Sequence, residues 1–435
     1  MRERKLEVPF DPLAAAERVV GLPGVALLYS GLRAYGLGRY SILAANPVRT
    51  IASRGFAAIE DVLSTVRSAE SGRLPFYGGP IGYFSYDAGR CLEPRQLTPS
   101  SGETADVRFS MYEGALVFDH EKGETWLTTS EEEISDKLEA FCSVAFSEGK
   151  SVIESFAMQT SLRSNFSRTD YLEAVDSVRA LIRRGDVYQV NLSQRFTAEC
   201  SGSAFELFLR LAKKSPAPYA AYLDFGDEQI VSSSPERFLL IENRQATTRP
   251  IKGTRSAGGS REEADANARE LELSEKDRSE LLMIVDLERN DLGRVCEPGS
   301  VRVDELFRLE RYATVIHQTA DVSGVLEAGV SPLDCVKAMF PGGSITGAPK
   351  IRAMQVIDEL ERGDRGIYTG AIGYFDASGQ VDLNIAIRTL RIADGRLSFQ
   401  VGGGIVWDSD PASEYEETLL KAEAMVSALG GSLDG

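Results

Sequence analysis

Runs of short strands that follow one another without an intervening helix constrain the fold of this chain most strongly. Residues 366–406 contain one such run, and residues 114–129 form another, in which Gly123 permits the positive φ of a hairpin turn. Helical patterns over residues 170–184 and 411–429 stand between or after these runs, and each is followed by a glycine suited to end a helix. Helices that alternate with runs of adjacent strands predict an α+β fold with antiparallel sheets.

Length and charge limit the classes of function. The chain has 435 residues, of which 43% are hydrophobic, so it can bury a large core in two or three domains or in one unusually large fold. A net charge of −17 argues against nucleic-acid binding, which needs a basic face. A polar, Ser-rich stretch at 147–165 predicts a linker between an N-terminal lobe, residues 1–150, and a second domain, residues 165–430.

The sequence also predicts where the protein resides. No segment resembles a signal peptide or approaches the roughly 20 apolar residues of a membrane span. Five cysteines without a C-x-x-C pair argue against disulfides and structural zinc, so we expect a reduced, cytoplasmic protein. With only two histidines, a metal ion is expected to be held by carboxylate oxygens, which favours magnesium, calcium or manganese.

Two predicted helices carry acidic residues at helical spacing. Asp277 and Glu280 share one face, and Glu414, Glu417 and Lys421 form a stripe on the other helix. A solvated charged surface explains either helix alone. If both faces are buried together, the carboxylates need a cation, and hard divalent ions use such oxygen clusters.

Glycine-rich segments and two isolated polar residues allow more than one interpretation. The loop at 341–350 lacks the Walker spacing for ATP, although its amides suit an anion such as a carboxylate. Three glycines at 402–404 permit close approach of a ligand, or they mark a kink in a strand. Lys252 and His317, taken singly, fit a solvated cation and a buried strand histidine as well as they fit catalytic groups.

Nine segments occur in an order that resembles the chorismate-utilising enzymes, the family of anthranilate synthase component I. Each segment is weak alone, but nine in order are specific. The resemblance is strong over residues 165–430 and weaker at 39–42 and 78–87. The segments are 188–195, 232–237, 249–255, 276–294, His317, 342–352, 368–374, 387–389 and 402–421.

The resemblance implies a large antiparallel sandwich of two sheets, with helices on its outer faces and a cleft for chorismate and Mg²⁺. Glu280 and Glu417 resemble the direct metal ligands, with Asp277 and Glu414 behind them. The metal would then bind the ring carboxylate of chorismate. The second, enolpyruvyl carboxylate needs its own cations or amides, and the positions that match this role are Tyr368, Arg388, Gly402, Gly403, Gly404 and Lys421. Thr346 and His317 match groups beside the ring substituents.

Two positions, Gln189 and Lys252, are similar to those that separate family members by chemistry. Members that add water to chorismate carry a lysine where this chain has Gln189, so water activation is disfavoured. Anthranilate synthases commonly carry alanine at the position of Lys252. The form Pro-Ile-Lys-Gly-Thr is similar to members in which this lysine attacks C2 of the ring and ammonia enters at C4. Glu236 then resembles the acid and base that moves the protons.

The resemblance also implies a partner. No cysteine lies in a G-x-C-x-G elbow, so ammonia is expected from a separate glutamine amidotransferase subunit or from solution. Tyr29 precedes Ser30 where members inhibited by tryptophan carry an acidic residue, so such inhibition is not expected. Two alternatives stay open: an anthranilate synthase component I, and a catalytically silent binding subunit, which would show gaps in the catalytic set.

Overall fold

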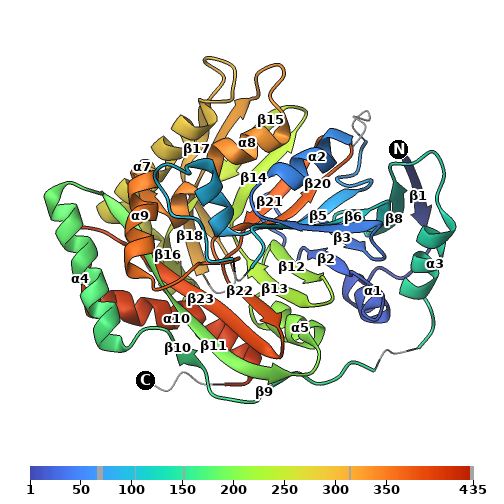
Figure 1. Cartoon of the computed structure of the whole chain (residues 1–435), viewed down its shortest axis with the longest axis horizontal. Coiled ribbons are helices and arrows are strands. Elements are labelled where there is room, and N and C mark those ends of the chain that lie inside the picture. The colour runs from blue at the N-terminus through green and yellow to red at the C-terminus, as the bar shows by residue number, and fades with distance from the viewer. Residues whose placement is uncertain (66–71, 103, 150–151, 313–314, 432–435) are drawn as a thin grey trace.

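Two large antiparallel sheets form the framework of the chain (Figure 1). The computed structural model describes residues 1–65, 72–102, 104–149, 152–312 and 315–431. The first sheet has thirteen strands within these residues and the second has ten. In Figure 1 the red β23 runs beside the green β11, so the end of the chain pairs with its middle.

The first sheet follows the order β1 (Arg2–Leu6), β8 (Glu124–Thr129), β7 (Gly114–Asp119), β3 (Tyr40–Ala44), β2 (Ala26–Tyr29), β12 (Tyr219–Asp224), β13 (Glu228–Ser234), β22 (Thr389–Ala393), β23 (Arg396–Ile405), β11 (Gln189–Ser201) and β10 (Arg163–Ser164), and β9 (Ala157–Met158) and β19 (Gly347–Ala348) also pair with β11. The second follows β16 (Ile251–Ser256), β18 (Val315–Val325), β15 (Gln245–Arg249), β14 (Arg237–Glu242), β21 (Val381–Ile385), β20 (Ala371–Phe375), β5 (Gly79–Phe84), β6 (Val107–Tyr112) and β4 (Arg49–Ser53), and β17 (Arg302–Arg311) pairs with β18.

Helices cover the outer faces of both sheets. Alternation along β3 shows the layering, because Ile42 packs into the core between the sheets whereas Leu43 packs toward the helices. Buried residues of α1 (Pro12–Val19), α3 (Asp136–Ala145), α5 (Ala204–Lys214) and α10 (Pro411–Leu429) complete the first outer core. Those of α2 (Ala57–Thr65), α7 (Glu275–Leu292) and α8 (Pro332–Met339) complete the second. The remaining helices are α4 (Arg168–Arg184), α6 (Arg261–Leu273), α9 (Lys350–Leu360), η1 (Tyr86–Leu92) and η2 (Gly343–Ile345).

Local sequence rules explain several of these boundaries. Ser167 caps α4 through a capping box with Asp170, and Gly185 ends the helix at φ 80°. Gly430 ends α10 in the same way. The predicted hairpin is confirmed as β7 and β8, with Gly123 at φ 63° in the turn. In the part of the chain that the structure describes, no helix combines the length and apolar character of a membrane span.

Two sequence expectations are corrected. The β-forming residues at 230–241 favour one continuous strand, but the segment divides between β13 of the first sheet and β14 of the second, because Pro235 has no N–H to continue a ladder. The predicted meander at 366–406 also changes sheets, between β21 and β22. Strands of residues 1–150 share both sheets with later strands, through the pairings β2 with β12 and β5 with β20. The predicted linker contributes β9 and β10, and its residues 150–151 lie outside the described part.

Candidate active site

Two of the places where the chain crosses between the sheets, from β13 to β14 and from β21 to β22, lie side by side. Glu236 occupies the first crossing and Arg388, at φ 50°, occupies the second. The carbonyl of Glu236 accepts from the amide of Ile385 at 3.0 Å, and the carbonyl of Arg388 accepts from the amide of Ser233 at 3.0 Å. The crossings therefore bring an acidic and a basic side chain to one region of the sandwich.

Glu236 is held on one carboxylate oxygen. Its Oε1 accepts from the hydroxyl of Ser344 at 2.7 Å and from the amide of Ile251 at 3.3 Å. The side chain is 5% exposed, and burial raises its pKa above the ordinary value although Ser344 and Lys252 oppose the shift. A buried carboxyl of this kind can serve as a proton donor and acceptor.

Lys252 lies on β16, next to this carboxyl. Among the described residues, no carboxylate oxygen lies within 4.0 Å of its Nζ. Burial lowers the pKa of Lys252, and Lys421 acts in the same direction, while Glu280, Glu236 and Glu417 oppose them. A lysine without a direct ion pair in this setting is more readily deprotonated than one in water, as a nucleophilic amine requires.

The glycines of β23 let side chains approach from two sides. A methyl group on Gly404 would lie 2.8 Å from Nε2 of Gln189 and 3.4 Å from Nζ of Lys252. One on Gly403 would lie 3.2 Å from Oε2 of Glu414. Since a Cβ at either position would press on these side-chain ends, the predicted glycine segment is where the lysine and the acidic helix meet.

Glu414 and Glu417 extend from α10 over this glycine strand. Glu414 is buried and its Oε1 accepts from Ser409 at 2.6 Å; burial raises its pKa. Partial burial acts in the same direction on Glu417, but the ammonium of Lys421 at 2.6 Å outweighs it and lowers the pKa of Glu417. Lys421 also donates to the carbonyl of Gly402 at 3.1 Å, so its ammonium already has two partners.

The other predicted acidic pair lies near the start of α7. Asp277 binds Arg255 of β16 at 2.9 Å. Glu280 is half-buried, and burial raises its pKa, with Lys252 and Lys276 opposing and Asp277 and Glu417 adding to the rise. Glu280 of α7 and Glu417 of α10 therefore both affect the pKa of Lys252, and Glu417 also affects the pKa of Glu280.

These carboxylates fit a hard cation only in part. The oxygens of Glu414 and Glu417 both lie within 3.8 Å of the position a Cβ on Gly403 would take, which is a cradle of hard donors. Within the described ranges, however, no three Asp, Glu, His or Cys side chains converge closely enough to hold a metal ion alone. The residues suit an ion that a substrate carboxylate helps to bind.

The remaining predicted residues lie around these groups. Nδ1 of His317 is 2.9 Å from Oγ1 of Thr254, and burial, with Arg388 nearby, lowers the pKa of His317 to about 4, so the ring is neutral at neutral pH. Burial also lowers the pKa of Arg388, whose Nη1 donates to Oγ of Ser215 at 3.3 Å. Thr346 donates to the carbonyl of Gly342 at 2.9 Å.

Sequence reasoning missed a buried ion pair beneath the loop that carries Ser344. Arg365 donates to both oxygens of Glu361 at 2.6 and 2.8 Å, and also to the carbonyls of Ile345 and Asn191. Its guanidinium lies 5.5 Å from the ring of Tyr368, whose pKa burial raises. The i,i+4 spacing was the only sequence pattern that marked this pair, and surface pairs have the same spacing.

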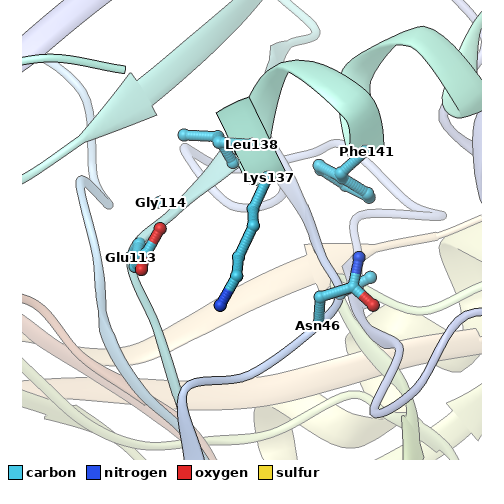
Figure 2. A pocket seen from close by; sticks show the side chains of 7 residues that line it. Asn46, Glu113, Gly114, Lys137, Leu138 and Phe141 are labelled. Carbon is cyan, nitrogen blue, oxygen red and sulfur yellow. The ribbon is translucent and has the colours of Figure 1, made fainter. Parts of the chain in front are cut away.

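A shallow pocket lies elsewhere, in the N-terminal half. Figure 2 shows Lys137 of α3 extending between Glu113 and Asn46, with Leu138 and Phe141 on the same helix. None of its lining residues belongs to the predicted site. The pocket therefore adds nothing to the chemistry around Lys252.

Fold and site together define a class. The two-sheet sandwich places Lys252, Glu236 and the carboxylates of two helices in one region, in agreement with the chorismate-utilising enzymes. The family model described as chorismate binding enzyme matches residues 30–427. The chain therefore belongs to the chorismate binding enzyme family, which confirms the predicted family, the fold class and an enzymatic role.

The relatives described next differ in their names. Aminodeoxychorismate synthase component 1 of Bacillus subtilis is 38% identical over 420 residues, 90% of this chain and 89% of that protein. Anthranilate synthase component 1 of Aquifex aeolicus is also 38% identical, over 85% of this chain and 78% of its own length. The crystal structure of anthranilate synthase component I from Streptococcus pneumoniae superposes with a TM-score of 0.78 at 35% identity, covering 91% of this chain and 93% of that one.

Proposed function

We propose that the chain is an aminodeoxychorismate synthase component I. It would convert chorismate and ammonia to 4-amino-4-deoxychorismate, the precursor of para-aminobenzoate in folate biosynthesis. The observation that carries the proposal is Lys252, a half-buried amine without a direct ion pair among the described residues, whose pKa burial lowers, beside the carboxyl of Glu236. Such a lysine suits nucleophilic attack better than simple binding of an anion.

In the proposed reaction Nζ of Lys252 bonds to C2 of the ring, the ring double bonds shift and the C4–oxygen bond breaks. Glu236 gives its proton to the departing hydroxyl, which leaves as water. Ammonia then bonds to C4 as the Nζ–C2 bond breaks, which returns the neutral amine of Lys252. The new C4 ammonium gives one proton back to Glu236, so the enzyme ends each cycle as it began.

Binding of the dianionic substrate is divided between two groups. Glu280 and Glu417 would hold Mg²⁺, supported by Glu414 and Asp277, and the ion supplies positive charge for the ring carboxylate. Arg388, Tyr368 and the amides of Gly402 to Gly404 would bind the enolpyruvyl carboxylate. Neutral His317 and Thr346 would donate or accept hydrogen bonds at the ring substituents, and Gln189 would line the site without activating water.

We further infer that ammonia comes from a separate glutamine amidotransferase subunit. The motivation is that no cysteine of the sequence lies in the G-x-C-x-G elbow expected of a glutamine-hydrolysing nucleophile. The name component 1, carried by relatives such as that of Bacillus subtilis, supports a two-component enzyme.

The second candidate is anthranilate synthase component I, which aminates the ring at C2 and releases pyruvate. Relatives with that name are as similar in sequence as those named for the first activity, and this observation keeps the candidate open. Lys252 supports the first candidate instead, because a lysine bonded at C2 would occupy the position that ammonia would have to attack.

Identification of the product tests the proposal. The purified chain is incubated with chorismate, Mg²⁺ and ammonium chloride, and the products are separated and identified by mass spectrometry. A 4-amino product that retains the enolpyruvyl group supports the proposal. Anthranilate together with an equal amount of pyruvate would overturn it in favour of the second candidate.

A further inference from the structure

A bulge in β16 sets Lys252 opposite one buried glutamine. Ile251 pairs with Thr319 and Thr254 pairs with His317, so two residues of β16, Lys252 and Gly253, face the single residue between them on β18. That residue is Gln318. The bulge permits the left-handed conformation of Gly253, at φ 77°.

Gln318 and Lys252 project from the same face of the sheet. The side chains of His317 and Thr254 contact each other on one face of the sheet. Because successive residues of a strand point to opposite faces, the side chain of Gln318 lies on the other face. A Cβ on Gly253 would meet Cβ of Asp277 at 3.0 Å, which shows that this stretch of β16 lies against α7. Glu280 of α7 is also the charged residue that acts most strongly on Lys252, so the lysine extends along the α7 side, where Gln318 lies. Directly opposed residues have Cβ atoms about 5 Å apart, within reach of two long side chains.

The amide of Gln318 is buried without hydrogen bonds. The residue is 0% exposed, and neither Oε1 nor Nε2 has a partner among the described residues. Buried amides nearly always have partners, because an unpaired polar group in the interior is costly. An apolar residue of similar size would avoid that cost, so the glutamine needs a reason other than packing.

We propose that Gln318 is a positioning residue for Lys252, which accepts an N–H of the neutral amine on its Oε1 and so directs the lone pair toward the substrate. The proposal rests on the proposed function, in which Lys252 is the nucleophile. An amide oxygen suits this task better than a carboxylate, because a neutral acceptor orients the amine without strongly favouring its protonated form. Glu236, held by Ser344, would then exchange protons with the substrate, while Gln318 would orient the amine of Lys252.

The test replaces Gln318 with methionine, which keeps the length and removes the amide. We expect kcat with chorismate and ammonia to fall about tenfold, with KM for chorismate within about twofold, because orientation of a reacting group acts on turnover. The melting temperature should rise by about 1–2 °C, because the buried Nε2, which has no partner among the described residues, is gone. A residue that served only the fold would not combine higher stability with lower turnover.

A second measurement does not depend on chorismate. Acetic anhydride acylates neutral amines, and peptide mass spectrometry compares its rate at Lys252 with the rate at exposed Lys122 in the same sample. We expect the ratio to fall severalfold in Gln318→Met and in Gln318→Leu. If the wild type fails to aminate chorismate, the proposed function fails, but this ratio still decides the role of Gln318.

Gln380 supplies the matched control. It lies in the turn between β20 and β21, is 8% exposed and also has an unpaired Oε1. Gln380→Met should leave kcat and the labelling ratio unchanged. Wild-type kcat and a wild-type labelling ratio in Gln318→Met would overturn the proposal.

Discussion

The hydroxyl of Ser344 donates a 2.7 Å hydrogen bond to Oε1 of Glu236, and so joins a loop after α8 to the point where the chain crosses from β13 of the first sheet to β14 of the second. The bond favours the ionised carboxylate, while burial favours the neutral acid. The acidity of Glu236 is therefore set by a residue about a hundred positions away in the sequence. Removal of that one hydroxyl should change the acidity without changing the position of the carboxyl.

Replacement of Ser344 by alanine should raise the pKa of Glu236, because it removes an interaction that lowers it. The inflection that Glu236 causes in the pH profile of kcat/KM should move to higher pH by about one unit. A shift of one pKa unit corresponds to about 1.4 kcal/mol, which is the size expected for one lost hydrogen bond. The measurement is the ammonia-dependent rate against pH, corrected for the fraction of free ammonia. Ser164→Ala on β10, which loses a hydrogen bond from its hydroxyl to Gln194 of β11, is the control. A profile that coincides with wild type would remove Ser344 from this role.

Loss of either proposed metal ligand should strongly lower turnover with the fold intact. Glu280→Gln and Glu417→Gln keep shape and remove one negative charge each, so we expect kcat/KM at limiting Mg²⁺ to fall by about 10² or more. The free energy of unfolding should change by less than about 1 kcal/mol, since both side chains are partly exposed. Glu416→Gln, exposed on the same helix as Glu417, should leave activity unchanged. Wild-type rates in both variants at limiting Mg²⁺ would show that the metal assignment is wrong.

How much the sequence could predict depends on the range of the interaction. Ser167 with Gly185, and Gly123 in its hairpin, act through the neighbouring backbone, so their roles were predictable. The crossing at Glu236 was not, because residues 230–241 are strand-forming throughout and only Pro235 marks the change of sheet. The order of nine segments predicted the family, and through it a set of candidate site residues on several elements. Lys252 or His317 considered singly could not predict the family, because each residue type fits several roles.

The contacts that the sequence did not predict join residues that lie far apart in the chain. The bond from Ser344 to Glu236 and the contact of Gly404 with Lys252 each join segments more than a hundred residues apart. No local pattern encodes such a pair. The bulge opposite Gln318 is also invisible in the sequence, because a glycine after a lysine is equally suited to a turn.

Variants of Lys252 should show whether this lysine acts as a nucleophile or only as a cation that binds the substrate. An unperturbed lysine is neutral in about one molecule in a thousand at pH 7.4, so the lowered pKa has a direct effect on rate. Lys252→Arg keeps the charge and cannot attack, so it should lose the 4-amino product. Lys252→Ala should consume some chorismate and form altered products, because space opens at C2. Intact-mass analysis with chorismate and no ammonia should show a covalent adduct in wild type and none in Lys252→Ala. An undiminished 4-amino product from Lys252→Arg would contradict the covalent route.

The source of nitrogen can be tested on the purified chain. Because no cysteine elbow is present, we expect turnover with ammonium chloride and none with glutamine. Addition of a glutamine amidotransferase subunit of this enzyme class should restore glutamine-dependent turnover. The measurement is product formation with either nitrogen donor at equal concentration. Glutamine-driven turnover by the chain alone would refute the requirement for a partner.

A second buried glutamate, Glu288, links stability to pH. It lies on α7, is 3% exposed, and its Oε2 has no partner within the described residues. Burial raises its pKa to about 8; a hydrogen bond from Thr248 opposes the shift, and the carboxylates of Glu236 and Asp291 add to it. Glu288 is therefore protonated at neutral pH in the folded protein and ionised in the unfolded chain.

Replacement of Glu288 by glutamine should stabilise the protein at neutral and alkaline pH. Between about pH 4.5 and 8 the folded state binds one more proton at this site than the unfolded state, so wild-type stability falls as pH rises through this window. Glutamine mimics the neutral acid and does not ionise. Below pH 4.5 the variant and the wild type should unfold alike, and at pH 8 the variant should be more stable by up to about 4 kcal/mol. Denaturant unfolding at several pH values measures this difference, and Asp286→Asn, exposed on the same helix, controls for the loss of one negative charge from α7. A stability difference that does not grow with pH would mean that Glu288 is ionised in the folded protein.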